Sequence, residues 1–187
     1  MRWYGVRALT AGAALTGTLL AITGPAHAVT GVNVAGGGTV LQIIAGNVPD
    51  NITVSVVGGT LHVSNSADTV PAAAPCVAVT ANEVACPAAG ILRIGAATSN
   101  GDDTFINDTA LPSRVDMGYG DDTFLGGSAT DEVRGRDGND KLLGRAGNDR
   151  LFGNPGDDIV DGQGGNDLAN GGTGVDACTA EVTVLCP

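Results

Sequence analysis

A nine-residue period constrains this sequence more than any other feature. From Met117 to Thr179 seven units follow one another without a gap. An earlier unit, Thr98–Ile106, precedes them across the ten-residue spacer Asn107–Asp116. The sixth position is Asp in all seven units, and the fourth is Gly in six, with Ala129 as the exception. Self-similarity of this kind predicts a solenoid, in which each repeat packs against its neighbours.

The repeat also has a recognisable pattern. Units such as Gly135–Leu143 (GRDGNDKLL) and Gly144–Phe152 (GRAGNDRLF) fit G-G-x-G-x-D-x-U-x, where U is apolar. This resembles the RTX, or hemolysin-type, calcium-binding nonapeptide repeat. The resemblance implies an all-β fold, a right-handed parallel β-roll or β-helix, with two nonapeptides in each coil of 18 residues. The chain is also similar to small Sec-secreted calcium-binding repeat proteins of actinobacteria, in which a Cys-containing tail such as Leu185-Cys186-Pro187 closes the roll.

Physical chemistry explains why this spacing suits calcium. Glycine permits the positive φ of a tight turn that aims carbonyl oxygens inward. Ca²⁺ takes about six to eight oxygen ligands, more than one turn supplies, whereas two turns stacked about 4.8 Å apart can supply them. Without a cation, carboxylates at that spacing would repel by roughly 1 kcal/mol per pair even in water. We therefore expect about five or six Ca²⁺ ions between neighbouring turns.

The 18-residue coil sorts the candidate ligands into two rows. The first row holds Asp122, Asp140, Asp158 and Asp176, with Asp103 as an additional candidate above Asp122. The second row holds Asp131, Asp149 and Asp167. By the family resemblance, carbonyl groups of turn glycines complete the shell: Gly120, Gly138, Gly147, Gly156, Gly165 and Gly174. The apolar eighth positions should form an internal ladder: Phe105, Phe124, Val133, Leu142, Leu151, Val160, Ala169 and Cys178.

Some repeat positions depart from the pattern. Ala129 replaces the turn glycine ahead of Asp131, and the spacer breaks the register at Asp103. The position-five acids are expected to form turns instead of binding metal: Asp102, Asp121 and Asp157. The cations near the acids are expected to be their surface partners: Arg134, Arg136, Lys141, Arg145 and Arg150.

The N-terminus has the order of a secretory signal peptide. Arg2 and Arg7 precede an apolar run that leads to Ala26-His27-Ala28, so we expect residues 1–28 to be a signal cleaved after Ala28 and the protein to be secreted. Residues 29–97 form a β-rich segment, residues 98–179 the calcium-binding roll and residues 180–187 a short tail. In the β-rich segment, short runs predict strands at Thr39–Ile44, Ile52–Val57, Thr60–Val63, Val77–Thr80 and Ile91–Ile94.

Four cysteines follow the expected signal peptide. Four Cys in an exported chain are typical of two disulfides, for which three pairings are open. The local pairing, Cys76 with Cys86 and Cys178 with Cys186, is favoured because each bond closes a short loop. Zinc is disfavoured, since no C-x-x-C spacing occurs and His62, the one histidine after the signal, is remote.

Charge and composition exclude several functions. The net charge is −11, and it becomes −13 when Arg2 and Arg7 leave with the signal. The sequence therefore lacks the excess cations that nucleic acid requires, and we expect no membrane insertion. His62 lies in a β-prone run without an obvious Ser or Cys partner, so we expect no enzyme activity.

Three hypotheses follow for function. The first is a secreted calcium-binding protein whose roll folds or rigidifies in extracellular calcium. The second is a cell-surface adhesin, matrix or surface-layer component that uses the roll as a spacer and has a cell-wall or self-association partner. The third, a β-helix polysaccharide hydrolase, is disfavoured because a sugar-binding cleft needs aromatic platforms. The chain offers four aromatic residues after the signal: Phe105, Tyr119, Phe124 and Phe152.

Overall fold

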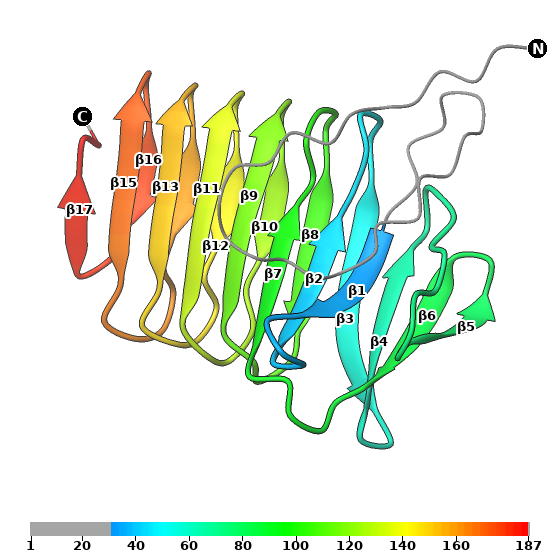
Figure 1. Ribbon diagram of the computed structural model, residues 1–187. Coiled ribbons are helices and arrows are strands. Elements are labelled where there is room, and N and C mark those ends of the chain that lie inside the picture. Colours follow the sequence, from blue (N-terminus) through cyan, green and yellow to red (C-terminus); the bar gives the residue numbers. More distant parts are fainter. Residues whose placement is uncertain (1–30, 187) are drawn as a thin grey trace, which may run out of the picture.

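The computed structural model describes residues 31–186 of the 187-residue chain, and the expected signal peptide lies outside them. The described chain forms two β-sheets that face each other along a solenoid (Figure 1). Within residues 31–186 there is no helix, which confirms the all-β prediction. It follows that no helix of this part is long and apolar enough to span a membrane.

Each sheet grows by one strand per coil. The eight-stranded sheet has the order β1 (Gly31–Ala35), β2 (Val40–Ile44), β7 (Arg93–Ala97), β9 (Ser113–Tyr119), β11 (Asp131–Asp137), β13 (Arg150–Pro155), β15 (Leu168–Thr173) and β17 (Val182–Val184). The nine-stranded sheet has the order β16 (Ala177–Thr179), β14 (Ile159–Asp161), β12 (Lys141–Leu143), β10 (Thr123–Leu125), β8 (Thr104–Asp108), β3 (Asn51–Val57), β4 (Thr60–Asn65), β6 (Glu83–Pro87) and β5 (Val77–Thr80).

From β7 onward the chain alternates between the two sheets, and every neighbouring pair is parallel. Phe124 pairs with Leu142, and Val133 pairs with Leu151. The turns stack at a sequence separation of 18 residues, which confirms the coil length expected from two nonapeptides.

The core is a ladder of single side chains between the sheets. The eighth-position residues from Phe105 to Ala169 are fully buried, and Cys178 at the open end is partly buried. The rings of Phe105 and Phe124 stack with their centroids 6.2 Å apart. Because each coil needs only one inward side chain per strand, a chain with few aromatic residues can fill this core.

The N-terminal segment is hydrogen-bonded directly to the first coil. Strand β2 pairs with β7, and β3 pairs with β8, both in parallel. Residues Leu41, Ile52 and Ile94 are fully buried and continue the core of the roll. Beyond β3 the sheet turns antiparallel through β4, β6 and β5.

The five strands predicted in this segment are present, with one shifted. The strand predicted at Ile91–Ile94 begins at Arg93 and runs to Ala97, because pairing with β2 and β9 extends it through residues of low β-propensity. Two strands had no prediction, β1 and β6, and β6 contains Glu83 and Pro87, which are rare in strand interiors.

Two disulfides form, Cys76–Cys86 and Cys178–Cys186, and no described cysteine is free. This is the local pairing that the short loops favoured. One bond fixes the N-terminal sheet, and the other ties the tail to the last coil.

Candidate metal centre

The predicted aspartates lie where the turns meet the strands. Asp103, Asp122, Asp140, Asp158 and Asp176 each precede a strand of the nine-stranded sheet. Asp131, Asp149 and Asp167 stand at the corresponding ends in the other sheet. All eight are at most 7% exposed, so the turns bury a carboxylate at each corner of the roll.

Within each row the aspartates are joined by hydrogen bonds. The backbone N–H of Asp122 donates to Oδ1 of Asp140 at 2.9 Å, and that of Asp140 donates to Oδ1 of Asp158 at 2.7 Å. Asp131 and Asp149 donate to the next carboxylate of the second row in the same way, each at 2.8 Å. The structure therefore brings the residues together in the two rows that the 18-residue coil predicts.

The second oxygen, Oδ2, of most of these carboxylates accepts no hydrogen bond from residues 31–186. Within the described chain, no hydrogen-bond donor reaches the buried Oδ2 atoms of Asp103, Asp122, Asp140, Asp149, Asp158, Asp167 and Asp176. A buried carboxylate oxygen without a partner is costly. A recurring set of such oxygens therefore indicates a bound cation wherever the neighbouring residues leave room for one.

The first glycine of each repeat makes room for these oxygens. A Cβ atom added to Gly135 would lie 1.9 Å from Oδ2 of Asp140 and 2.8 Å from the carbonyl oxygen of Gly153, in the next coil. For Gly153 the corresponding distances are 2.1 Å to Oδ2 of Asp158 and 2.6 Å to the carbonyl oxygen of Gly171. Carboxylate and carbonyl oxygens thus converge on one point at each corner.

Gly144 forms a third corner of this kind, with Oδ2 of Asp149 at 2.4 Å and the carbonyl oxygen of Gly162 at 2.7 Å from the added Cβ. In residues 31–186, no three His, Cys, Asp or Glu side chains are grouped to hold a metal. A metal at these corners would therefore need backbone carbonyls beside the carboxylates. Such an all-oxygen donor set suits Ca²⁺.

Comparison with known families agrees with this geometry. The RTX calcium-binding nonapeptide repeat matches residues 118–151 and 143–177, with four copies. This part of the chain consists of RTX repeats. Residues 118–177 therefore match RTX calcium-binding repeats, and they lie within a β-solenoid. No curated protein and no solved structure matches the chain.

The position-four glycines of the RTX repeats are sterically required. Gly138 has a φ of +143°, and a Cβ added there would lie 1.9 Å from the carbonyl oxygen of Gly120. Gly147, Gly165 and Gly174 likewise have positive φ and face the carbonyl oxygen of the preceding turn in their row. The carbonyl groups of the position-four glycines therefore point along the stack of turns. The carbonyl groups that face the Oδ2 atoms belong to the position-one glycines. The site predicted from the sequence did not include these position-one glycines.

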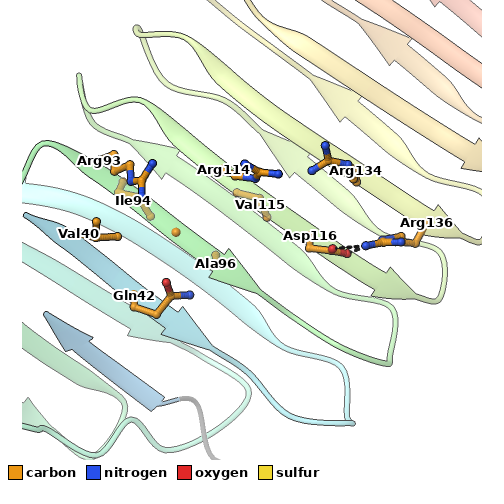
Figure 2. Close-up of a pocket in the computed structure, with 11 residues that line it drawn as sticks. Val40, Gln42, Arg93, Ile94, Ala96, Arg114, Val115, Asp116, Arg134 and Arg136 are labelled. Atoms are coloured by element: carbon orange, nitrogen blue, oxygen red, sulfur yellow. Dashed lines mark hydrogen bonds and ion pairs between the residues drawn. The ribbon is translucent and has the colours of Figure 1, made fainter. Parts of the chain in front are cut away.

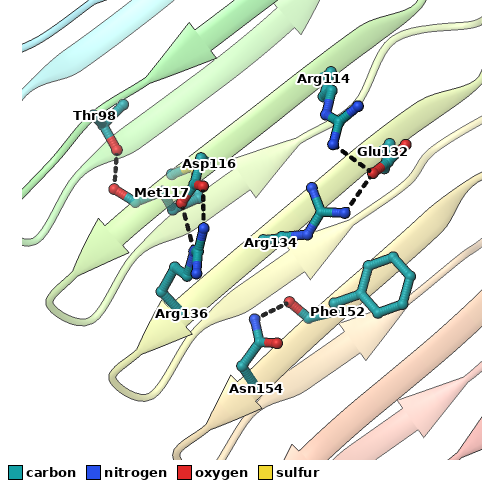
Figure 3. Close-up of polar contacts among 9 residues, drawn as sticks. All are labelled: Thr98, Arg114, Asp116, Met117, Glu132, Arg134, Arg136, Phe152 and Asn154. Atoms are coloured by element: carbon teal, nitrogen blue, oxygen red, sulfur yellow. Dashed lines mark hydrogen bonds and ion pairs between the residues drawn. The ribbon is translucent and has the colours of Figure 1, made fainter. Parts of the chain in front are cut away.

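Two corners ahead of the matched repeats are filled by side chains. Thr98 and Met117 occupy position one, and both are fully buried. The hydroxyl of Thr98 donates to the carbonyl oxygen of Met117 (Figure 3). The carbonyl group of Met117 is equivalent to the carbonyl group of Gly153 at the Gly135 corner. At Thr98, a hydroxyl group thus contacts this carbonyl in the position where a cation would lie at Gly135.

The corner of Asp131 is satisfied by protein donors. Its Oδ1 accepts from the N–H of Ser113 at 2.8 Å and from the side-chain amide of Asn107 at 3.2 Å. Its Oδ2 accepts from the N–H of Gly127 at 2.9 Å. Asp131 therefore differs from the other aspartates of its row.

The spacer does not displace Asp103 from the first row. The N–H of Asp103 donates to Oδ1 of Asp122 at 2.7 Å across 19 residues. Strand β9 pairs in parallel with β11, as a repeat strand does. This coil has one residue more than the usual 18, and that residue lies in the corner between Asp108 and Ser113. The register break expected here is thus confined to one corner.

The rows continue beyond the predicted residues. The N–H of Asp50 donates to Oδ1 of Asp103 at 2.7 Å, and Asn65 donates to Oδ1 of Asp50. At the other end, Glu181 accepts from the N–H of Asp167 at 2.8 Å. The order Asp50-Asn51-Ile52 contains the Asp-x-apolar triplet of the repeats, and this signal could have found Asp50. No period leads to Glu181.

Burial raises the pKa of most carboxyls in the two rows. The pKa values of Asp122, Asp140 and Asp149 are about 7, and those of Asp103 and Asp158 are about 6, mainly because burial disfavours the charged form. Neighbouring carboxylates raise the pKa values further, while the backbone N–H bonds lower them. These five carboxyls are therefore partly protonated at neutral pH in the absence of calcium.

The surface cations pair with other acids. Arg134 contacts Glu132 at 2.6 Å, Arg136 contacts Asp116 at 2.6 Å, and Arg145 contacts Asp108 at 3.4 Å. His62 contacts Glu83 through Nδ1 at 2.6 Å. The acids in these pairs lie outside the two rows.

Proposed function

We propose that the protein is a secreted calcium-binding protein in which Ca²⁺ occupies the glycine corners and rigidifies the roll outside the cell. The observation that carries this proposal is the convergence of an unpartnered Asp Oδ2 and a next-coil carbonyl at Gly135, Gly144 and Gly153. Ca²⁺ bound there would offset the repulsion between stacked carboxylates.

The corners differ in how fully they are built. Those of Asp140, Asp149 and Asp158 have the glycine, the free oxygen and the facing carbonyl, so we infer at least three calcium sites. The corners at Thr98 and Met117 are filled by side chains, and we infer that they bind no calcium. The first coil then provides a calcium-independent template for the coils that follow.

Calcium titration of the chain that begins at Val29 tests this function. Calorimetry should show saturable binding, and circular dichroism should show β structure rising from the chelated to the calcium-loaded state. Extracellular modules bind Ca²⁺ at about 10⁻⁴–10⁻³ M. A site occupied at about ten times its Kd adds roughly 1.4 kcal/mol of stability. Full β structure in chelator together with no heat of calcium binding would contradict the proposal.

Secretion rests on the N-terminal sequence. Expression of the full chain in a host with Sec export should place the protein outside the cell, with Val29 as its first residue. Retention of the chain inside the cell at full length would contradict cleavage after Ala28.

We also infer a binding role in place of catalysis. The described cysteines are all in disulfides, so none offers a thiolate nucleophile. A screen against polysaccharides and esters should detect no hydrolysis, and turnover of any of them would contradict this inference.

A further inference from the structure

The eight-stranded sheet carries a basic depression on its outer face (Figure 2). It has a volume of about 380 Å³ and is lined by four arginines: Arg93, Arg114, Arg134 and Arg136. Residues 31–186 contain seven Lys and Arg in all, so more than half of them gather here. In a chain with a net charge of −11, such a concentration of cations calls for an anionic ligand.

Two of the arginines form the fixed wall of the depression. Arg136 holds Asp116 with two hydrogen bonds, Nε to Oδ1 at 2.8 Å and a terminal nitrogen to Oδ2 at 2.6 Å. Arg134 contacts Glu132 at 2.6 Å and lies over the ring of Phe152, 5.7 Å from its centroid (Figure 3). Asp116 in the lining of the depression and the neighbouring Glu132 are thus each matched by an arginine already present.

The other two arginines have uncommitted donors. Arg93 is exposed and forms no ion pair with any described acid. Arg114 is 61% exposed and reaches Glu132 only at 3.5 Å. Gly95, two residues from Arg93 on β7, pairs with Gln42 on one side and with Arg114 on the other. A Cβ added to Gly95 would lie 2.9 Å from Oε1 of Gln42, so the Gln42 amide covers the glycine beside the two guanidinium groups.

We propose that this depression binds a phosphodiester of a linear polyol or sugar phosphate polymer. Two guanidinium groups from neighbouring strands can each donate to one free oxygen of a phosphodiester, so that both oxygens of one group are bound. The amide of Gln42 can take a hydroxyl of the polymer. The depression is partly open to solvent, so a polymer chain can extend beyond it.

Other polyanions fit less well. The residues that line the depression include no aromatic ring on which bases could stack, and the overall charge repels nucleic acid. The site lies away from the buried aspartate rows and does not depend on the calcium proposal. An anionic cell-envelope polymer as ligand would favour the surface-component alternative.

The test uses a short poly(glycerol phosphate) as the probe, titrated into the protein in millimolar calcium. The wild type should bind it, and added salt should weaken the binding. The double variant Arg93→Glu/Arg114→Glu should bind about tenfold more weakly or worse, with an unchanged circular dichroism spectrum. Lys141→Glu, a charge reversal in the other sheet, should stay within about twofold of wild type.

Two further ligands complete the test. Uncharged polyglycerol should not bind, and an oligogalacturonate, which carries carboxylates, should bind more weakly than the phosphate polymer. The proposal is overturned if the wild type does not bind the phosphate polymer or if the double variant binds it as tightly. It is also overturned if either of the other ligands binds at least as well.

Discussion

Two aspartates in neighbouring turns on the same side of the roll differ in what surrounds them. Asp140 is 1% exposed and has an unpartnered Oδ2, whereas Asp121 is exposed and accepts from the N–H of Asn139. Asp140→Asn should lower calcium affinity roughly tenfold or more, since even changes around a metal ligand cost about 10–100-fold. Asp121→Asn removes the same charge but keeps the acceptor, so it should change affinity little.

Calorimetric titration of both variants measures this difference. Equal losses in the two variants would mean that calcium responds to overall charge and not to the buried carboxylate.

Position two of the repeats holds residues in a strained conformation. Arg136, Arg145, Asn154 and Gln163 have φ values between 66° and 90°, a region that costs a non-glycine residue about 1–2 kcal/mol. The last repeat has Gly172 at this position, with a φ of 114°. The positive φ explains why the consensus has glycine at position two. Its replacement in these four repeats stores strain along both edges of the roll, since successive repeats turn on opposite sides.

Relief of this strain should stabilise the protein. Gln163 is exposed, and its only hydrogen bond in the described chain is made by its backbone N–H, which glycine retains. Gln163→Gly should raise stability by up to about 1 kcal/mol, after the entropy cost of glycine, and should raise Tm by a few degrees. Gln163→Ala keeps the strain and should show no such gain. A lower Tm for the glycine variant would contradict this reading.

At the scale of elements, the C-terminal tail closes the open end of the roll. Strand β17 pairs with β15, Glu181 accepts from Asp167, and the Cys178–Cys186 bond fixes the loop. Replacing both cysteines by alanine should cost about 2–3 kcal/mol. The loss should appear first as faster amide exchange in β15 and β17.

The second disulfide provides the matched control. Replacing Cys76 and Cys86 by alanine removes a bond of similar loop length from the N-terminal sheet, so exchange in β15 and β17 should not change. Uniformly faster exchange in both variants would mean that the roll unfolds as a single unit and that the tail has no local role.

The repeats allowed most of their elements to be predicted. A period of nine fixes which side chains point inward and which aspartates stack, because each coil repeats the same geometry. Glu181 and the contacts of Asp50 and Thr98 could not be predicted from the nine-residue period, since they depend on how non-repetitive segments pack onto the first and last coils. Strand β6 was missed for the same reason, as its pairing with β4 overrides the low β-propensity of Glu83 and Pro87.

At the scale of the molecule, the buried rows make stability depend on pH. In the calcium-free protein, Asp122, Asp140 and Asp149 have folded pKa values of about 7, against an ordinary value of 3.8. The folded state thus holds more protons than the unfolded state between these values, so stability falls as pH rises. Below about pH 4 this penalty is absent, and above about pH 7 it is complete.

Thermal unfolding in chelator at several pH values tests this dependence. Tm should be higher at pH 5 than at pH 8, and calcium should restore stability at pH 8, where the carboxylates are charged. Asp116, whose pKa Arg136 lowers, acts in the opposite direction but only below its ordinary pKa. A calcium-free Tm that rises between pH 5 and pH 8 would contradict the assignment of the rows as the controlling groups.

A crystal structure grown in millimolar calcium, with anomalous scattering to identify the metal, tests the central claim most directly. The account predicts calcium at the Gly135, Gly144 and Gly153 corners, bound by Oδ2 of Asp140, Asp149 and Asp158 and by carbonyls of the next coil. The Thr98 corner should hold none. Water or side-chain donors at those three glycine corners, with calcium present in the crystal, would contradict it.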